Sequence, residues 1–277
     1  MVVHEQTRRV AAVFDRVAAT YDSVGVDWFT PIAQGLVREL APQPGERAVD
    51  IGCGRGAALF PLAEAVGSAG HVTGFDISSE MVRTTLRDVE ARGVTNVDVL
   101  VADASQPELE LELGAYDLAC ASLVAFFLPD PLVGLKAWRD LLAPGGRIGI
   151  SSFGPRDQLW VDIDALFTPF LPPQMLDART RGASGPFASD AAVEGLLGDA
   201  GFRQVRTVTS HVTVRFKDAE QWYAWSWSHG QRAMWESVPE DLREGLKSQA
   251  SDILGRVADE RQRITLTQGI RYTLGAR

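Results

Sequence analysis

Short apolar runs alternate with longer amphipathic stretches through the middle of the chain. The apolar runs are rich in Val, Ile, Leu and Ala, whereas the stretches between them have the length of helices. Strands at this spacing, separated by helices, are typical of a parallel sheet covered by helices on both faces. The pattern therefore predicts a doubly wound α/β core. Its expected strands are residues 47–51, 71–77, 97–101, 116–123 and 147–153, and its expected helices are 57–66, 79–92 and 132–142.

Both flanks of this core have a different pattern. Apolar residues recur at steps of three and four over residues 5–22, which predicts a helix, and a second helix is expected over 31–40. Prolines and aromatic residues fill 154–187, which we interpret as an insertion or lid. The remaining elements are expected to be a helix over 190–201, a strand over 202–216, helices over 218–236 and 239–260, and a last strand over 264–274. We expect an N-terminal helical lid (1–45), a core (46–153) and a C-terminal part of insertion, cap helices and last strands (154–277).

Composition narrows the class of protein. The 277 residues are 45% hydrophobic and 23% charged, as in ordinary soluble proteins, and the net charge of -9 argues against nucleic acid or an anionic membrane as the main partner. The two cysteines lack metal-ligand spacing, so we expect neither a metal site nor a disulfide framework. The sequence shows no signal-peptide core and no apolar run of membrane-spanning length. We expect a cytoplasmic protein without membrane insertion, and a homodimer is compatible with this composition.

A glycine-rich turn follows the first expected strand. The strand carries the carboxylate Asp50, and Gly52, Gly54 and Gly56 come directly after it. Glycine permits a tight turn and lets a ligand lie against the backbone. The N-terminus of the following helix then offers unpaired N–H groups. This stretch therefore predicts the first half of a nucleotide-binding βαβ unit.

Three carboxylates decide which ligand suits this turn. Asp50 beside the turn would repel a pyrophosphate and attract an ammonium group. Asp76 ends the second strand, where a carboxylate accepts hydrogen bonds from ribose hydroxyls, and Asp103 ends the third, where it can accept from the adenine amine. These strand ends share one edge of a parallel sheet. The implied ligand has an ammonium, a ribose and an adenine but no phosphate, which describes S-adenosylmethionine.

Four motifs along the chain resemble those of a known family. Asp-Ile-Gly-Cys-Gly-Arg-Gly at 50–56, Phe-Asp-Ile-Ser at 75–78, Val-Ala-Asp-Ala at 101–104 and Leu-Leu-Ala-Pro-Gly-Gly at 141–146 resemble the successive motifs of class I S-adenosylmethionine-dependent methyltransferases. Residues 13–22 are similar to the segment before the core in the ubiquinone/menaquinone methyltransferase group and in related bacterial natural-product enzymes. The resemblance implies a Rossmann-like, mostly parallel seven-stranded sheet with N-terminal helices and a helical cap. Residues 264–274 are then the candidate for the antiparallel seventh strand.

The resemblance also implies a role for individual residues. The methionine end of the cofactor would contact the turn and the end of the fourth strand, the ribose and adenine would contact the ends of the second and third strands, and Tyr21 would close over the cofactor carboxylate. For Tyr21 and Met81 simple packing is an equally good interpretation. The implied cofactor-binding residues are Tyr21, Asp50, Gly52, Gly54, Asp76, Ile77, Met81, Asp103, Ala104 and Ser122. The product formed from the cofactor would be S-adenosylhomocysteine.

The acceptor is less clear from the sequence. Methyl transfer is an in-line displacement aided by alignment and exclusion of water, and a general base helps where the acceptor is a hydroxyl or a carbon acid. His229 and His211 are the candidate bases. Aromatic residues near His229 favour a small aromatic or apolar acceptor, methylated on O, N or C in bacterial small-molecule biosynthesis, although the aromatic stripe also suits a core. The expected pocket residues are Phe126, Phe127, Trp222, Trp225 and His229.

Three other functions are compatible with this pattern. The same fold can bind S-adenosylmethionine and catalyse a different reaction, such as a cyclisation, because fold does not fix function. A nicotinamide-dependent oxidoreductase would also use a glycine-rich turn, and a non-catalytic binding module would use the C-terminal part as an interaction surface.

Overall fold

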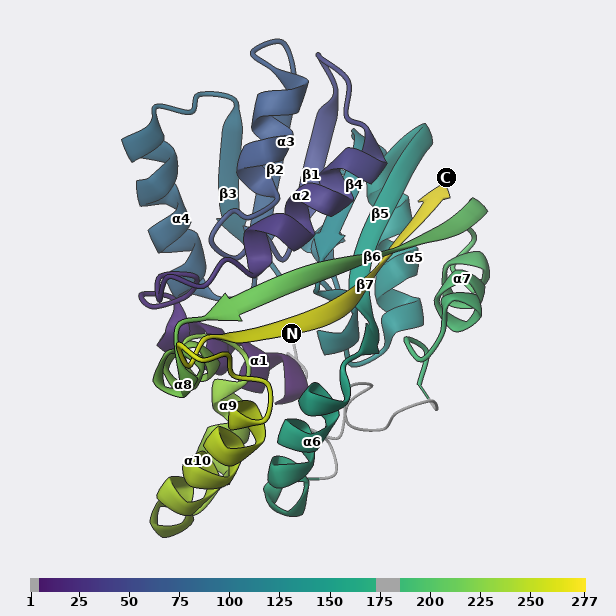
Figure 1. Ribbon diagram of the computed structural model, residues 1–277. Helices are drawn as coiled ribbons and strands as arrows, with labels where there is room; N and C mark the ends of the chain where they lie inside the picture. Colours follow the sequence, from purple (N-terminus) through teal and green to yellow (C-terminus); the bar gives the residue numbers. More distant parts are fainter. Residues whose placement is uncertain (1–4, 173–184) are drawn as a thin grey trace.

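The computed structural model describes residues 5–172 and 185–277. Within these ranges seven strands form one sheet in the order β3-β2-β1-β4-β5-β7-β6 (Figure 1). Strands β1 to β5 pair in parallel, and β7 runs antiparallel to both of its neighbours. The expected doubly wound, mostly parallel seven-stranded sheet with an antiparallel last strand is confirmed.

The bounds of the elements follow the expected order. The strands are β1 (Arg47–Ile51), β2 (His71–Asp76), β3 (Val97–Val101), β4 (Tyr116–Ser122), β5 (Leu142–Arg156), β6 (Arg203–Phe216) and β7 (Ile264–Ala276). The helices are α1 (Glu5–Val17), α2 (Phe29–Leu40), α3 (Leu59–Val66), α4 (Ser79–Arg92), α5 (Pro131–Leu141), α6 (Gln158–Phe167), α7 (Asp190–Asp199), α8 (Ala219–Trp227), α9 (Arg232–Ser237) and α10 (Glu240–Gly255). Short 3₁₀ turns lie at Pro107–Leu109, Ala125–Phe127 and Thr168–Phe170.

Helices cover both faces of the sheet. Successive residues of β1 point to opposite faces, so Ala48 packs in the core under α2 and α3, whereas Val49 and Ile51 pack in the core under α5 and α7. Figure 1 shows α2 and α3 crossing one face, with α5 and α7 behind the sheet. The sheet is therefore buried on both sides, as its apolar strands require.

Local signals fix where the helices at the site begin. Ser78 caps α4 through its hydroxyl, which accepts from the N–H of Met81 at 3.1 Å. Asp130 caps α5 in the same way, and Pro131 occupies the first helical position. Ser78 comes two residues after the end of β2, so the start of α4 lies at the carboxyl edge of the sheet.

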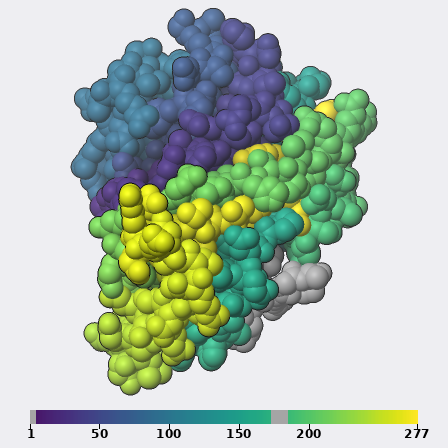
Figure 2. All heavy atoms as spheres, in the orientation of Figure 1, coloured from purple at the N-terminus to yellow at the C-terminus, as the bar shows by residue number. Residues whose placement is uncertain are grey.

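The helices α1, α6, α8, α9 and α10 gather at one end of the sheet (Figure 1). Figure 2 shows the C-terminal part of this group, coloured green to yellow, projecting as a block beyond the purple and blue half of the molecule. No helix within residues 5–172 and 185–277 is long and apolar enough to span a membrane. The end helices instead form a roof over the carboxyl edge of the sheet.

Two expectations about the C-terminal part are wrong in detail. The single helix expected over 218–236 is two helices, because α8 ends at Trp227 and α9 begins at Arg232. The hydroxyls of Ser226 and Ser228 donate at 2.7 Å to carbonyls one turn back, and Gly230 lowers the helix propensity further.

The segment expected to be an insertion is partly regular. Strand β5 continues to Arg156, where it pairs with Gln268 of β7, and α6 follows at once. The rest of that expectation, over residues 173–184, lies outside the described residues. The expected N-terminal helix is also shorter, because residues 18–22 form turns after α1.

Candidate active site

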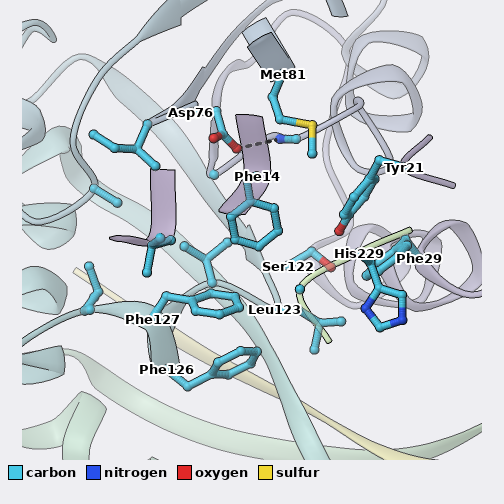
Figure 3. Close-up of a pocket in the computed structure, with 18 of the residues that line it drawn as sticks. Phe14, Tyr21, Phe29, Asp76, Met81, Ser122, Leu123, Phe126, Phe127 and His229 are labelled. Carbon is cyan, nitrogen blue, oxygen red and sulfur yellow. Dashed lines mark hydrogen bonds between the residues drawn. The ribbon is translucent and has the colours of Figure 1, made fainter. Parts of the chain in front are cut away.

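A cavity lies between the carboxyl edge of the sheet and the end helices. Its empty space is about 1350 Å³, counted out to its mouth, which is more than one nucleoside needs. In Figure 3, Asp76 and Met81 lie on one side of the cavity, Phe126 and Phe127 on the opposite side, and Ser122 between them. Most of the residues expected from the sequence line it: Tyr21, Gly52, Gly54, Asp76, Ile77, Met81, Asp103, Ala104, Ser122, Phe126, Phe127, Trp225 and His229.

Three expected residues are not brought to the cavity wall. Asp50 lies beneath the glycine-rich turn and is 1% exposed. Trp222 is fully buried in the core beside Trp235, with ring centroids 6.3 Å apart, so as a pocket residue it was misplaced. His211 is exposed on β6 and lines a separate hollow, so the fold does not bring it to this cavity.

The glycine-rich turn presents bare backbone to the cavity. Gly52 and Gly54 have φ of +64° and +49°, which favours glycine. A Cβ on Gly52 would lie 2.6 Å from Cγ2 of Val124, whereas one on Gly54 would meet no atom within 4 Å. The space beside Gly54 is thus a cradle that a side chain would fill.

Asp76 is held in place by two backbone N–H groups. Its Oδ2 accepts from the N–H of Gly54 and its Oδ1 from that of Ser78, both at 2.9 Å, and Figure 3 shows the first of these bonds. Burial raises the pKa of Asp76 to about 6, and the two hydrogen bonds oppose this rise. Each oxygen keeps a lone pair, so the side chain can accept two more hydrogen bonds from vicinal hydroxyls.

Asp50 is a buried carboxylate that lacks a full set of partners. Among the described residues, nothing donates a hydrogen bond to its Oδ2. Burial, together with the nearby charge of Asp76, raises its pKa well above the ordinary value. An unpaired buried carboxylate costs free energy, and a cationic ligand group lowers that cost. The ammonium of S-adenosylmethionine fits this requirement.

The ends of β3 and β4 complete the polar edge. Asp103 accepts from the N–H and the hydroxyl of Ser105 at 2.8 and 2.7 Å, which fixes the loop after β3. The carbonyl of Ala104 accepts from the indole of Trp138 at 2.7 Å. Ser122 ends β4 and lies within 3.2 Å of the Ser151 hydroxyl on β5, measured between the oxygens. These contacts make the edge rigid before any ligand binds.

Helix α1 docks over this edge through named contacts. Asp15 accepts from the Ser78 hydroxyl at 2.6 Å and from the N–H of Glu80 at 3.2 Å. After the helix, Tyr21 stacks on Phe29 with ring centroids 4.5 Å apart. Burial is the largest cause of the raised pKa of Tyr21, and the charges of Asp22 and Asp76 add to it. Tyr21 is therefore a neutral phenol that borders the cavity near Asp76.

The other half of the cavity has aromatic walls, which we call the aromatic chamber: Trp28, Phe126, Phe153, Trp160 and Trp225. The ring centroid of Trp28 lies 5.8 Å from that of Trp160 and 5.6 Å from that of Trp225. Phe126 stacks on Phe153 with ring centroids 5.4 Å apart. Sequence reasoning missed Trp28, Phe153 and Trp160 because they come from separate segments without a shared motif. The chamber offers flat apolar surfaces on several sides.

His229 lies in the turn between α8 and α9, at the border of the chamber. It is 8% exposed, and its ring centroid lies 4.3 Å from that of Trp225 and 5.7 Å from that of Phe29. The N–H of Gln231 donates to its Nδ1 at 3.3 Å. With Nδ1 as acceptor, the neutral ring carries its proton on Nε2.

Comparison with known proteins agrees with this geometry. The fold and the carboxylates at the carboxyl edge of its sheet are those of a class I methyltransferase, and residues 48–146 match the family model described as "Methyltransferase domain". Nocamycin O-methyltransferase of Saccharothrix syringae is 36% identical over 95% of this chain and 96% of its own length. Aklanonic acid methyltransferase DauC of Streptomyces sp. (strain C5) is 39% identical over 61% of this chain and 76% of its own.

The solved structures agree on the fold. Phosphoethanolamine N-methyltransferase 2 of Haemonchus contortus, in complex with phosphomonomethylethanolamine and S-adenosylhomocysteine, superposes with a TM-score of 0.60 at 16% identity over all of this chain and 60% of that one. The chain belongs to the S-adenosylmethionine-dependent methyltransferases. It is a methyltransferase whose cofactor is S-adenosylmethionine.

Proposed function

We propose that this enzyme methylates an oxygen atom of a small, ring-containing natural product. The observation that carries the proposal is that the aromatic chamber and the cofactor-binding edge open into one cavity. Flat rings bind favourably between aromatic side chains. Two relatives, an O-methyltransferase of nocamycin and a methyltransferase of aklanonic acid, support an oxygen acceptor and a natural-product substrate.

We assign the cofactor to the polar edge. Asp50 would balance the ammonium, and the backbone of Gly52 and Gly54 would hold the methionine part beside Ser122. Asp76 would accept from both ribose hydroxyls. The adenine would lie between Ile77 and Met81, with Asp103 and Ala104 at its edge, and Tyr21 would cover the cofactor carboxylate.

When bound, S-adenosylmethionine supplies a methyl group already activated by a sulfonium. The protein's task is therefore to align the acceptor oxygen and to exclude water. Alignment of this kind contributes about 7–11 kcal/mol in well-oriented reactions. The stacked rings of Trp28, Phe126 and Phe153 hold a flat acceptor in one plane, and the docked helix α1 limits access of water.

We propose that His229 orients the acceptor. Because Nδ1 accepts from the backbone, Nε2 carries the proton and can donate to the acceptor oxygen, which would then react as an oxyanion whose proton has already passed to water. A role as general base would require the other tautomer. This assignment replaces the base expected from the sequence with a hydrogen-bond donor.

Turnover on a set of acceptors tests the proposal. The purified enzyme is incubated with S-adenosylmethionine and hydroxylated polycyclic compounds, and S-adenosylhomocysteine and methylated products are measured by mass spectrometry. We expect an O-methyl product, located by NMR. A rearranged product that gains no methyl group would instead support a cyclase-like function, and methylation of nitrogen or carbon alone would contradict the oxygen assignment.

A further inference from the structure

The cavity has a polar wall at the junction of β5, α6 and β7. Arg156 at the end of β5, Asp164 on α6 and Gln268 on β7 all line it. The backbones of Arg156 and Gln268 are paired in the sheet. Nη1 of Arg156 donates to Oδ2 of Asp164, and their side chains are 17% and 16% exposed. We call these three residues the polar wall.

The amide of Gln268 has a fixed orientation. The residue is 3% exposed, and its Nε2 donates to the carbonyls of Gly269 at 2.7 Å and Gly154 at 3.3 Å. With Nε2 held by the backbone, Oε1 is the amide atom left to face the cavity. In the described part of the chain no donor reaches this oxygen. Oε1 is open to the cavity and not sealed in the core, so a ligand donor can reach it there.

The chemistry of an amide oxygen selects the kind of ligand group. Oε1 of Gln268 can only accept hydrogen bonds. A carboxylate on the ligand has no hydrogen to donate and would be repelled by this oxygen. A neutral hydroxyl donates to Oε1 and brings no charge that must lose its hydration.

The polar wall is remote from the cofactor. Ser151 of β5 contacts Ser122 beside the proposed methionine part, and Arg156 lies five residues further along the same strand. At the rise of an extended strand this separation is about 16 Å. The aromatic chamber fills the space between, with Phe153 on that strand. An acceptor that reaches both ends must therefore carry its polar group away from the atom that is methylated.

We propose that Gln268 determines acceptor specificity by accepting a hydrogen bond from a neutral hydroxyl on the end of the ring system remote from the methylated oxygen. This inference rests on the proposed function and names its substrate class: ring compounds with a second, distal hydroxyl. Trp160 supports the position of Gln268, because its indole donates to the carbonyl of Thr267 at 3.1 Å. The polar wall is thus built into the joint between α6 and β7.

Binding of simple ring compounds tests the inference without a known acceptor. The full-length enzyme, saturated with S-adenosylhomocysteine, is titrated by calorimetry with 2-naphthol and 2-naphthoate, and naphthalene is measured by competition. We expect 2-naphthol to bind about tenfold more tightly than naphthalene, which is the effect of one hydrogen bond in a buried site. We expect 2-naphthoate to bind no better than naphthalene.

The variant Gln268→Leu should remove this preference for the hydroxyl and leave the affinity for naphthalene within twofold. The matched control is Gln158→Leu on the exposed side of α6, where the amide donates to Asp162 at 2.8 Å. Retained preference in Gln268→Leu would overturn the inference, as would tighter binding of 2-naphthoate than of 2-naphthol. Affinity for S-adenosylhomocysteine checks the fold of each variant.

If Gln268→Leu fails to bind S-adenosylhomocysteine, Gln268→Asn takes its place. Asn keeps the amide, but its side chain is one methylene shorter, so the amide oxygen no longer reaches the same position. It should lose most of the preference, and an unchanged preference would contradict the inference. Failure of the proposed function has a different signature. An enzyme that prefers 2-naphthol through Gln268 but methylates no acceptor would refute the function and leave the hydroxyl site standing.

Discussion

At the scale of the residue, Asp76 is the group on which cofactor affinity depends most directly. Its two backbone hydrogen bonds place both oxygens before any ligand arrives. We predict that Asp76→Ala weakens binding of S-adenosylmethionine at least tenfold, because two hydrogen bonds to a charged group are lost. Calorimetry measures the change. Asp98→Ala, at an exposed carboxylate on β3, is the matched control and should change affinity less than twofold. Equal affinities for the two variants would mean that the nucleoside lies elsewhere.

The raised pKa of Asp76 predicts a pH dependence of cofactor binding. Burial brings the pKa to about 6 in the cofactor-free protein, and the ionised form is the better acceptor for ribose hydroxyls. Affinity should therefore be constant above about pH 7 and fall as the pH drops through 6, by an amount that approaches tenfold per unit. Titrations between pH 5 and 8 measure this. Asp76→Asn should bind weakly with a flatter profile, whereas an equally steep profile would assign the titration to another group.

Substitutions of His229 distinguish a hydrogen-bond donor from a general base at this position. We predict that His229→Gln keeps much of the turnover, within about tenfold, because its amide can donate near the position of Nε2. His229→Ala should lose more, since it removes the contact and opens a space. A general base would predict equal and larger losses in both variants, of about 10²–10⁴-fold. Rates of S-adenosylhomocysteine formation distinguish the two roles.

Residues that follow strands could be predicted from the sequence, whereas residues of the chamber could not. Asp76 and Asp103 both line the cavity, as expected for residues that follow parallel strands, because such strands end at one edge of the sheet. Trp28, Trp160 and Gln268 lie far apart in the chain and meet only through tertiary packing. Trp222 and Trp225 have the same local pattern, yet one enters the core and the other the cavity. No short-range signal distinguishes such a pair.

At the scale of the element, α1 depends on contacts with the core to stay over the site. Asp15 is its link to the start of α4. We predict that Asp15→Ala increases hydrogen exchange in α1 and speeds dissociation of S-adenosylmethionine a few-fold, because loss of a charged hydrogen bond costs about 1.5–3 kcal/mol. Glu5→Ala is the control, since within residues 5–172 and 185–277 the ion pair of Glu5 is with Arg9 on the same helix. Similar exchange in the two variants would contradict a covering role for α1.

The break between α8 and α9 shows why element boundaries are harder to predict than elements. A continuous helix would have kept the 3.6-residue period that places Trp225 and His229 on one face. The serine hydroxyls end α8 first, and His229 is carried by the turn instead. It still reaches Trp225, by a different backbone path. The sequence pattern therefore predicted correctly that His229 lies near Trp225, but it placed His229 on a helix and not in the turn after α8.

At the scale of the whole molecule, the cavity joins parts from almost the full length of the chain. Thr7 and Gln268 line it together with the ends of the core strands. Ligand binding should therefore stabilise the entire fold. At a concentration 100 times its dissociation constant, S-adenosylhomocysteine should add about 2.7 kcal/mol to the free energy of unfolding. Thermal melts measure the shift in Tm, which should be about half as large, or smaller, for Asp76→Ala at the same ligand concentration. A full shift in that variant would contradict the role given to Asp76.

The position of β7 in the sheet also affects folding during synthesis. Although β7 comes last in the described sequence, it lies between β5 and β6 in the sheet. A nascent chain therefore exposes the unpaired edge of β5 from the time Arg156 appears until Ala276 is joined, a span of 120 residues between the ends of the two strands. At about 5–20 residues per second this lasts roughly 6–24 s. An exposed strand edge can pair with other chains and cause aggregation. The yield of folded enzyme should therefore rise at low expression temperature, or when chaperones cover β5 on the ribosome.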